Sequence, residues 1–167
     1  MRRTGILFIM AALFFLLPSC DNEGFQVFEW KESYSELPDN PVKKLSWLRE
    51  AKDNVKAYLD KNIDYYNQVN YSADVPYPHS FVDVYKYEGE TYYYLFIQDV
   101  DGAQDPLSSY FFCPILFKEN GEIYLSGIHY IPAFEQSEEG RLFFSKASRT
   151  QRLWSYELIR TNDCGCF

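Results

Sequence analysis

Three aspartates in one short segment are the residues whose type and spacing best suit a metal ion. Asp99, Asp101 and Asp105 surround Gly102, and carboxylate oxygens of this kind are the ligands that Ca²⁺ prefers. The segment departs from an EF-hand loop, because its glycine comes one step after the second aspartate and no glutamate closes the loop. An acidic turn between two strands explains the same residues, so we expect no cofactor and keep calcium as the alternative.

The sequence contains 2 histidines, His79 and His129, and either side chain can act as a general base. They are not accompanied by a Gly-x-Ser-x-Gly elbow or by a recognisable Cys-His signature. His79 lies beside prolines in a predicted loop, and His129 falls in a predicted strand, where a structural role is the commoner outcome. Carboxylate pairs for glycoside hydrolysis are defined by separation in space, so catalysis stays open as an alternative.

The start of the chain has the layout of an export signal. Two arginines precede an apolar run over residues 6–17, which is shorter than the roughly 20 residues that a membrane-spanning helix needs. The run ends in Leu17-Pro18-Ser19-Cys20, which resembles the lipobox of bacterial lipoproteins. We therefore predict that residues 1–19 are a signal peptide and that Cys20 becomes the lipidated amino terminus. An ordinary secretory signal with a chance cysteine is the alternative.

The residues after Cys20 predict where the protein is held. Asp21-Asn22-Glu23 resembles the acidic address that directs many Gram-negative lipoproteins to the outer face of the outer membrane. Each buried methylene of an acyl chain contributes about 0.8 kcal/mol to membrane binding, so several chains at Cys20 would anchor the domain without help from its surface. We expect an outer-membrane, lipid-anchored protein that faces outward.

Three further cysteines, Cys113, Cys164 and Cys166, would share the oxidising compartment that this address implies. We expect a disulfide between Cys113 and one of the terminal pair, which would tether the tail to the sheet. Redox chemistry and soft-metal ligation are the alternatives. A zinc site needs about three or four ligands, and the histidines needed to complete one are scarce.

Composition limits the fold and the partners. Removal of residues 1–19 takes two arginines with it and changes the net charge from −8 to −10, which argues against nucleic acid as a partner. Aromatic residues make up 19% of the chain, with 15 tyrosines and 14 phenylalanines, and this excess favours β-structure. The length suits a single domain.

Residues 20–38 are predicted to be a lipidated tether and residues 39–167 a single domain, although Phe25, Val27, Phe28 and Trp30 also suit an edge strand. Asp39-Asn40-Pro41 is a helix start, and apolar residues recur at helical spacing from Val42 to Tyr66. We expect an α+β fold in which one long N-terminal helix packs on a meandering antiparallel β-sheet.

Strands are expected over residues 81–87, 91–98, 110–118, 122–126, 129–133, 142–146 and 151–159, with hairpin turns at Gly89 and at Asn120-Gly121. Along residues 91–98, Tyr92, Tyr94 and Phe96 alternate with Tyr93, Leu95 and Ile97. Because both faces of this strand are apolar, we expect it to be central and covered on each side.

Leu45-Ser46-Trp47-Leu48 and the tyrosine-rich run from Tyr85 to Tyr94 resemble segments of small, uncharacterised Gram-negative bacterial lipoproteins. Over residues 41–125 the resemblance implies a short helix followed by a tyrosine-rich hairpin. Members of that group often carry more cysteines around the hairpin than the Cys113 found here. The resemblance implies no activity, cofactor or catalytic residue.

Together these features predict a lipid-anchored cell-envelope protein that binds or interacts without catalytic activity. Its partners would be the membrane, through Cys20, and a protein or glycan. Aromatic rings such as Tyr92, Tyr94, Trp47 and Trp154 are candidates for the contact with that ligand, and packing between helix and sheet is their alternative role. The alternative functions are a small envelope hydrolase that acts on glycan or peptide, and a protein inhibitor or immunity-like lipoprotein.

Overall fold

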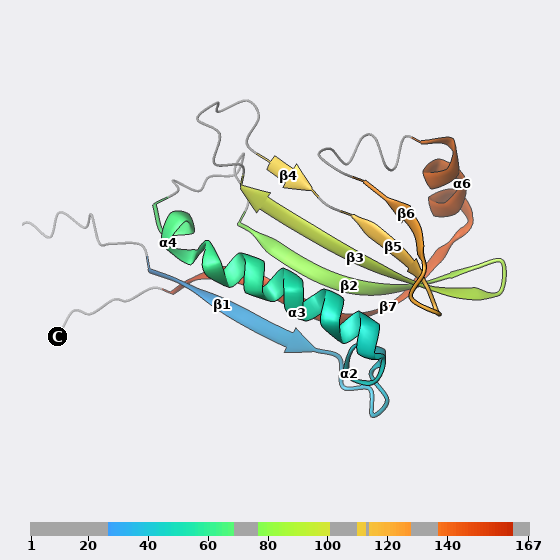
Figure 1. The fold of residues 1–167 in the computed structure, drawn as a ribbon, viewed down its shortest axis with the longest axis horizontal. Helices are drawn as coiled ribbons and strands as arrows, with labels where there is room; N and C mark the ends of the chain where they lie inside the picture. The colour runs from blue at the N-terminus through green and yellow to red at the C-terminus, as the bar shows by residue number, and fades with distance from the viewer. Residues whose placement is uncertain (1–26, 69–76, 101–109, 113, 128–136, 162–167) are drawn as a thin grey trace, which may run out of the picture.

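A computed structural model describes residues 27–68, 77–100, 110–112, 114–127 and 137–161. They form a seven-stranded antiparallel sheet in the order β1-β7-β2-β3-β5-β6, and β4 pairs with β3. In Figure 1, β1 and β6 lie on opposite sides of the central strands. The strands are β1 (Val27–Tyr34), β2 (His79–Tyr87), β3 (Glu90–Val100), β4 (Tyr110–Phe112), β5 (Ile115–Lys118), β6 (Ile123–Ser126) and β7 (Ser148–Thr161).

The predicted fold, one long N-terminal helix on a meandering sheet, is wrong. The described residues are mostly antiparallel sheet, and they begin with β1 rather than with a helix. The helical segment is broken into α2 (Pro41–Lys44), α3 (Ser46–Lys61) and α4 (Ile63–Tyr66). Leu45 ends α2 with an extended backbone at φ −79° and ψ 112°, and Asn62 separates α3 from α4. The apolar stripe persists across both breaks, which explains why the pattern predicted one helix.

The sheet is not a meander, because its last strand lies inside it. β7 pairs with β1 on one side and with β2 on the other. Consecutive strands are usually neighbours, so the sequence order gave no sign of this insertion. Residues 27–34 lie within the segment predicted as tether, and they form the edge strand that their apolar side chains also indicated.

The predicted helix start is confirmed at Asn40. Its side-chain oxygen accepts a hydrogen bond of 2.9 Å from the Val42 N–H, and Pro41 follows it at the start of α2. The Asn40 amide nitrogen also donates to Ser35 Oγ at 3.0 Å and to Leu153 O at 2.9 Å. This buried cap therefore fixes the start of the helical segment to β7.

Both predicted hairpins are present. Glu88 and Gly89 have positive φ angles of 50° and 85° between β2 and β3, as a tight hairpin turn requires. Gly121, with φ 87°, lies between β5 and β6. A Cβ atom at Gly121 would stand 2.9 Å from the ring of Trp47, so the close approach of α3 requires glycine there.

The predicted strand at residues 142–146 is wrong, because these residues belong to helix α6 (Glu138–Lys146). Ser137 caps the helix by accepting a hydrogen bond of 3.0 Å from the Gly140 N–H. Two glutamates occupy the first turn and Lys146 the last, which suits the helix dipole. These end signals outweigh the β propensity of Phe143 and Phe144.

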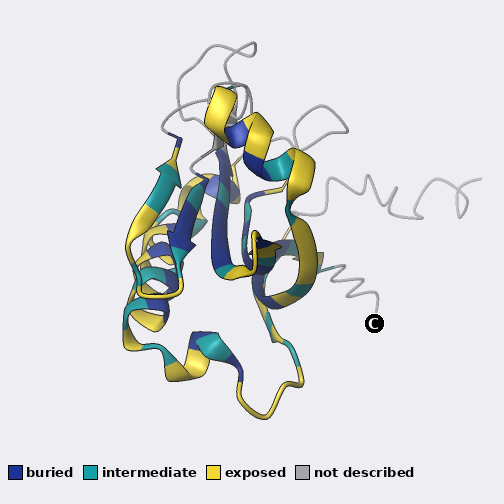
Figure 2. Ribbon diagram, turned by 90° about the vertical axis from the view of Figure 1, so that its right-hand side faces the viewer, coloured by how far each residue is buried: buried dark blue, intermediate teal, exposed yellow. Residues whose placement is uncertain are grey.

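The sheet has a core on each face. Residues of α3 pack with one face, in a cluster that includes Leu48, Leu59, Leu95 and Trp154. Phe143 of α6 packs on the other face, and buried strands lie between the two helices (Figure 2). Tyr93 and Leu95 face the first cluster, whereas Tyr92, Tyr94 and Phe96 face the second. The prediction that β3 is central and covered on both faces is confirmed.

Candidate functional site

A pocket that combines charged and apolar side chains lies where β2 begins and β7 ends. Its volume is about 460 Å³, and residues 77–79 and 157–160 line it together with Arg152. The antiparallel pairing of β2 with β7 places His79 opposite Glu157. This pairing brings the two lining segments together although they are far apart in the sequence.

Arg152 is held in one orientation at the wall of this pocket. Its Nε donates to Asp83 Oδ1 at 2.9 Å, and its Nη2 donates to Asp83 Oδ2 at 3.2 Å. Its guanidinium carbon lies 3.9 Å from the centroid of the Phe81 ring. A guanidinium fixed by a bidentate pair and an aromatic face is pre-organised for planar anions such as carboxylates.

The pair between Arg152 and Asp83 is unequal in its exposure to solvent. The Asp83 side chain is 2% exposed, and that of Arg152 is 42% exposed. The register between β2 and β7 shifts between Val82 and Asp83, which brings Arg152 opposite the carboxylate. The buried aspartate therefore serves as a counter-ion, while the arginine keeps N–H groups toward solvent.

His79 offers the pocket a second polar group. Its Nδ1 lies 3.1 Å from the Tyr77 carbonyl oxygen, and a carbonyl can only accept, so this contact places a proton on Nδ1. The ring packs 5.6 Å from the Phe96 ring centroid. Within the described residues, neither a serine nor a cysteine lines the pocket.

The charge of the lining differs from that of the whole chain. The chain carries a formal net charge of −8, whereas the lining contains two arginines and one glutamate. Arg152 shares a face of the sheet with its strand partner Asp83, whereas Arg160 pairs with Phe28, which packs in the core on the α3 face. The guanidinium on the same face as His79 and Glu157 is therefore that of Arg152. Tyr77, Pro78 and Ile159 add apolar surface. An apolar lining with a few convergent polar groups is typical of a ligand site, and this one suits a partly apolar ligand with an anionic group.

The aromatic rings predicted as ligand contacts lie elsewhere. Tyr92, Tyr94 and Trp154 are buried in the two cores. Trp47 packs against the core on the α3 face, and its ring centroid lies 5.2 Å from that of Phe117. Their packing role, the alternative given for them, is the one that the structure has.

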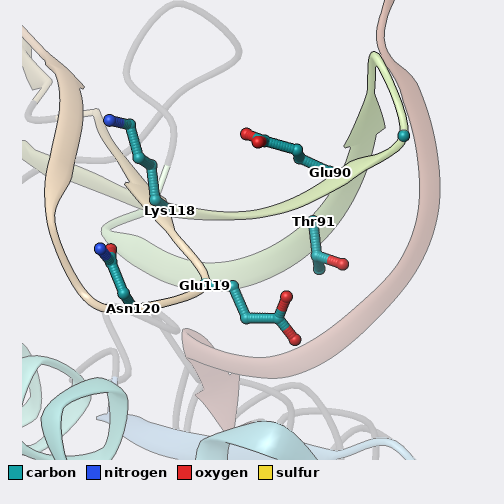
Figure 3. Close-up of a pocket in the computed structure, with 6 residues that line it drawn as sticks. Glu90, Thr91, Lys118, Glu119 and Asn120 are labelled. Atoms are coloured by element: carbon teal, nitrogen blue, oxygen red, sulfur yellow. The ribbon is translucent and has the colours of Figure 1, made fainter.

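A second, more polar hollow of about 310 Å³ lies between the β2–β3 and β5–β6 turns. Figure 3 shows that the side chains of Glu90 and Lys118 point to one side, and those of Thr91 and Glu119 to the other. Lys118 is already paired with Glu122 at 3.1 Å, and Glu90 accepts a hydrogen bond from Tyr92. These two side chains are already bonded to neighbours outside the lining, so we do not take this hollow as the site.

Asp99, one of the three candidate calcium ligands, lies buried near the end of β3. Its Oδ1 accepts a hydrogen bond of 2.7 Å from the Tyr66 hydroxyl, and its Oδ2 accepts one of 2.5 Å from the Tyr58 hydroxyl. These two hydrogen bonds therefore connect α3 and α4 to β3. Asp101 and Asp105 lie outside the described residues, within which no metal-binding group was found; calcium stays an untested alternative.

Several other predicted residues also lie outside the described part of the chain. They are Cys20, Cys113, Cys164, Cys166 and His129. Lipidation of Cys20 and a disulfide of Cys113 therefore stay predictions. Among the helices that the structure describes, none is long and apolar enough to cross a membrane.

The sequence did not indicate the pocket. Residues 151–159 were predicted as a strand, and His79 as part of a loop that leads into the strands. Arg152 and Glu157 had no motif to mark them, because only the pairing of β2 with β7 brings Arg152 opposite Asp83 and Glu157 opposite His79. Asp83, the counter-ion of Arg152, is a polar residue within a largely apolar strand, and nothing in the local sequence indicates its role.

Comparison with known proteins adds no relationship to this picture. No family model, curated protein or solved structure matches the chain.

Proposed function

We propose that this protein is a lipid-anchored binding module of the outer membrane, attached through Cys20 and facing outward. The observation that carries the proposal is the pocket beside Arg152, where a fixed guanidinium adjoins apolar side chains. Its ligand is partly apolar and carries an anionic group, such as the carboxylate of a peptide or an acidic sugar. The groups that line the pocket are suited to binding rather than to catalysis.

The position of β1 supports an anchor close to the domain. The described part of the sheet begins at Val27, and residues 21–26 link it to Cys20. At about 3.6 Å per extended residue, this link reaches no further than about 25 Å. A lipidated Cys20 would therefore keep the pocket near the membrane surface, within reach of envelope molecules.

The anchor is tested by intact-protein mass spectrometry of membrane fractions. The expected mass corresponds to residues 20–167 plus acyl chains, and Cys20→Ala should remove both the acyl mass and the membrane association. A two-dalton gain on reduction would show the predicted disulfide. An unmodified mass, or cleavage at another residue, would refute the lipoprotein proposal.

The pocket is tested by photo-crosslinking in intact cells, with the photoreactive residue at Ile159 in the lining. Leu142, which is exposed on α6, provides the control position. We expect one dominant adduct from position 159 and no such adduct from position 142. Arg152→Lys, which keeps a cation beside Asp83 but removes the planar guanidinium, should weaken the adduct. Identical adducts from both positions would refute a specific pocket. Turnover of a glycan or peptide by the purified protein would instead support the hydrolase alternative.

A further inference from the structure

A row of polar side chains crosses the sheet at the level of His79. His79 pairs with Glu157 of β7 on one side and with Gln98 of β3 on the other, and Glu157 pairs in turn with Lys31 of β1. Directly opposite residues of antiparallel strands lie on the same face of a sheet. We call Lys31, Glu157, His79 and Gln98 the polar row, which crosses four neighbouring strands. Phe96, two residues before Gln98, packs on the α6 face, so the polar row lies on that face, and two of its members line the pocket.

The two members on either side of His79 require different groups from a ligand. Gln98 is 7% exposed, and among the described residues its Nε2 has no hydrogen-bond partner. A buried N–H without an acceptor is unfavourable, so Gln98 favours a ligand that brings an oxygen. Glu157 is exposed and its carboxylate only accepts, so it favours a ligand that brings a donor. A hydroxyl both donates and accepts, and a ligand with several hydroxyls therefore satisfies both residues.

Asp83 has two arginine partners, and one of them lies outside the pocket lining. Arg149 Nη1 lies 3.5 Å from Asp83 Oδ2, the oxygen that also accepts from Arg152 Nη2. Two guanidiniums around one carboxylate leave one positive charge uncompensated at this point of the sheet. A ligand carboxylate supplies the single negative charge that balances it, whereas a phosphate monoester brings about 1.5 to 2 negative charges. The anion that fits here is therefore a carboxylate.

The anion site and the polar row lie next to each other along β2. The Arg152 guanidinium lies over the ring of Phe81, which follows His79 by two positions on the same face, so the separation is about 7 Å. The carboxylate and the hydroxyls of one sugar ring extend in opposite directions over a comparable span. We infer that the ligand of the pocket is a uronic acid sugar, with its carboxylate beside Arg149 and Arg152 and its hydroxyls at the polar row. This inference rests on the proposed function and narrows its ligand class.

The test is calorimetric titration of the mature chain, residues 20–167, with Cys20→Ser to prevent lipidation. The probes are trigalacturonate and trimannuronate, each compared with its neutral counterpart, in which the carboxylates are reduced to alcohols. We expect at least one acidic trisaccharide to bind, and its neutral counterpart to bind at least about tenfold more weakly, because it lacks the charge-assisted contact. Arg149→Gln and Gln98→Met should each weaken binding by about threefold to tenfold. Arg141→Gln, which replaces an exposed arginine of α6, should leave binding unchanged.

Arg149→Gln provides a test that does not depend on the core, because the Arg149 side chain is 58% exposed. Circular dichroism checks the folding of Gln98→Met, which keeps the approximate shape of glutamine. Equal affinities for acidic and neutral trisaccharides, no binding of either acidic one, or wild-type affinity of Arg149→Gln would overturn the inference. Tighter binding of a peptide carboxylate, with an acetylated dipeptide of phenylalanine and alanine as the probe, would also overturn it. The adduct at position 159 tests the proposed function separately, so with that adduct present these results reject the sugar and leave the pocket.

Discussion

The two faces of the sheet are held by different kinds of contact. On the α3 face, tyrosine hydroxyls reach carboxylates across the interface: Tyr66 donates to Asp99, and Tyr156 donates to Asp60. Burial and the bond to Asp60 raise the pKa of Tyr156 above its ordinary value. On the α6 face, rings gather around Phe143, whose centroid lies 5.0 Å from that of Tyr87. On the α3 face directional bonds add to a large apolar cluster, whereas on the α6 face the packing centres on one ring.

This difference teaches where each face is vulnerable. Hydrogen bonds fix the position of α3 along the sheet, but each contributes modestly because it replaces a bond to water. A buried ring at the centre of a cluster packs closely against its neighbours, and water does not restore those contacts when the ring is removed. We therefore expect the α6 face to depend on one residue and the α3 face to spread its dependence over several.

The largest effect is expected for Phe143→Ala. Phe143 is 0% exposed and contacts the rings of Tyr87 and Tyr92. Its truncation leaves a cavity that should lower the free energy of unfolding by about 3–5 kcal/mol. Urea denaturation followed by circular dichroism provides the measurement.

The control on the same helix is Leu142→Ala, whose side chain is exposed. It should change the free energy of unfolding by less than about 0.5 kcal/mol. Equal losses in the two variants would show that helix propensity, and not the Phe143 ring, stabilises the α6 face.

The next effect is expected at high pH. Burial raises the pKa of Tyr92 to about 12, aided by the hydrogen bond to Glu90. An unfolded chain loses this proton near about pH 10. Between these two values the native state keeps a proton that the unfolded state has lost, so rising pH favours unfolding. The contribution is intact below about pH 10 and falls by about 2–3 kcal/mol toward pH 12.

Free energies of unfolding measured across this range check the prediction, with Tyr92→Phe as the control. The variant lacks the titrating group, so its stability should decline less steeply with pH than that of the wild type. Matching slopes would assign the alkaline sensitivity to other tyrosines, among which Tyr156 is the first candidate.

Local pattern predicted the elements whose cause is local. The Asn40 cap and the turns at Gly89 and Gly121 depend on neighbours in the chain, and the structure confirms all three. The alternation along β3 likewise predicted cover on both faces. In contrast, Phe143 and Phe144 suggested a strand, because propensity was weighed without the Ser137 cap that starts α6.

Long-range pairing was beyond these patterns. Nothing in residues 148–161 marks a strand that will enter between β1 and β2. The pocket depends on that insertion and on the register shift beside Asp83. The breaks at Leu45 and Asn62 leave the apolar stripe intact, so periodicity alone could not reveal them.

A smaller effect is expected for Tyr66→Phe on the α3 face. The change keeps the ring but removes the hydroxyl that donates to Asp99 Oδ1 at 2.7 Å. The carboxylate stays buried with one donor fewer, so the free energy of unfolding should fall by about 1–3 kcal/mol. Ser145→Ala removes an exposed hydroxyl bond to the Leu142 carbonyl oxygen and should cost less than about 0.5 kcal/mol. Similar losses in both variants would show that the buried hydrogen bond from Tyr66 to Asp99 contributes no more than an exposed one.

The smallest effect is expected for Ser137→Ala, at the cap of α6. Loss of the hydrogen bond to the Gly140 N–H should cost about 1 kcal/mol. Ser137→Asp keeps an acceptor and should retain most of the stability, and hydrogen exchange of the first α6 amides should report the fraying directly. If Ser137→Ala cost as much as Phe143→Ala, the cap would hold α6 as firmly as the ring does. The contrast between a face held by directional bonds and one held by packing would then fail.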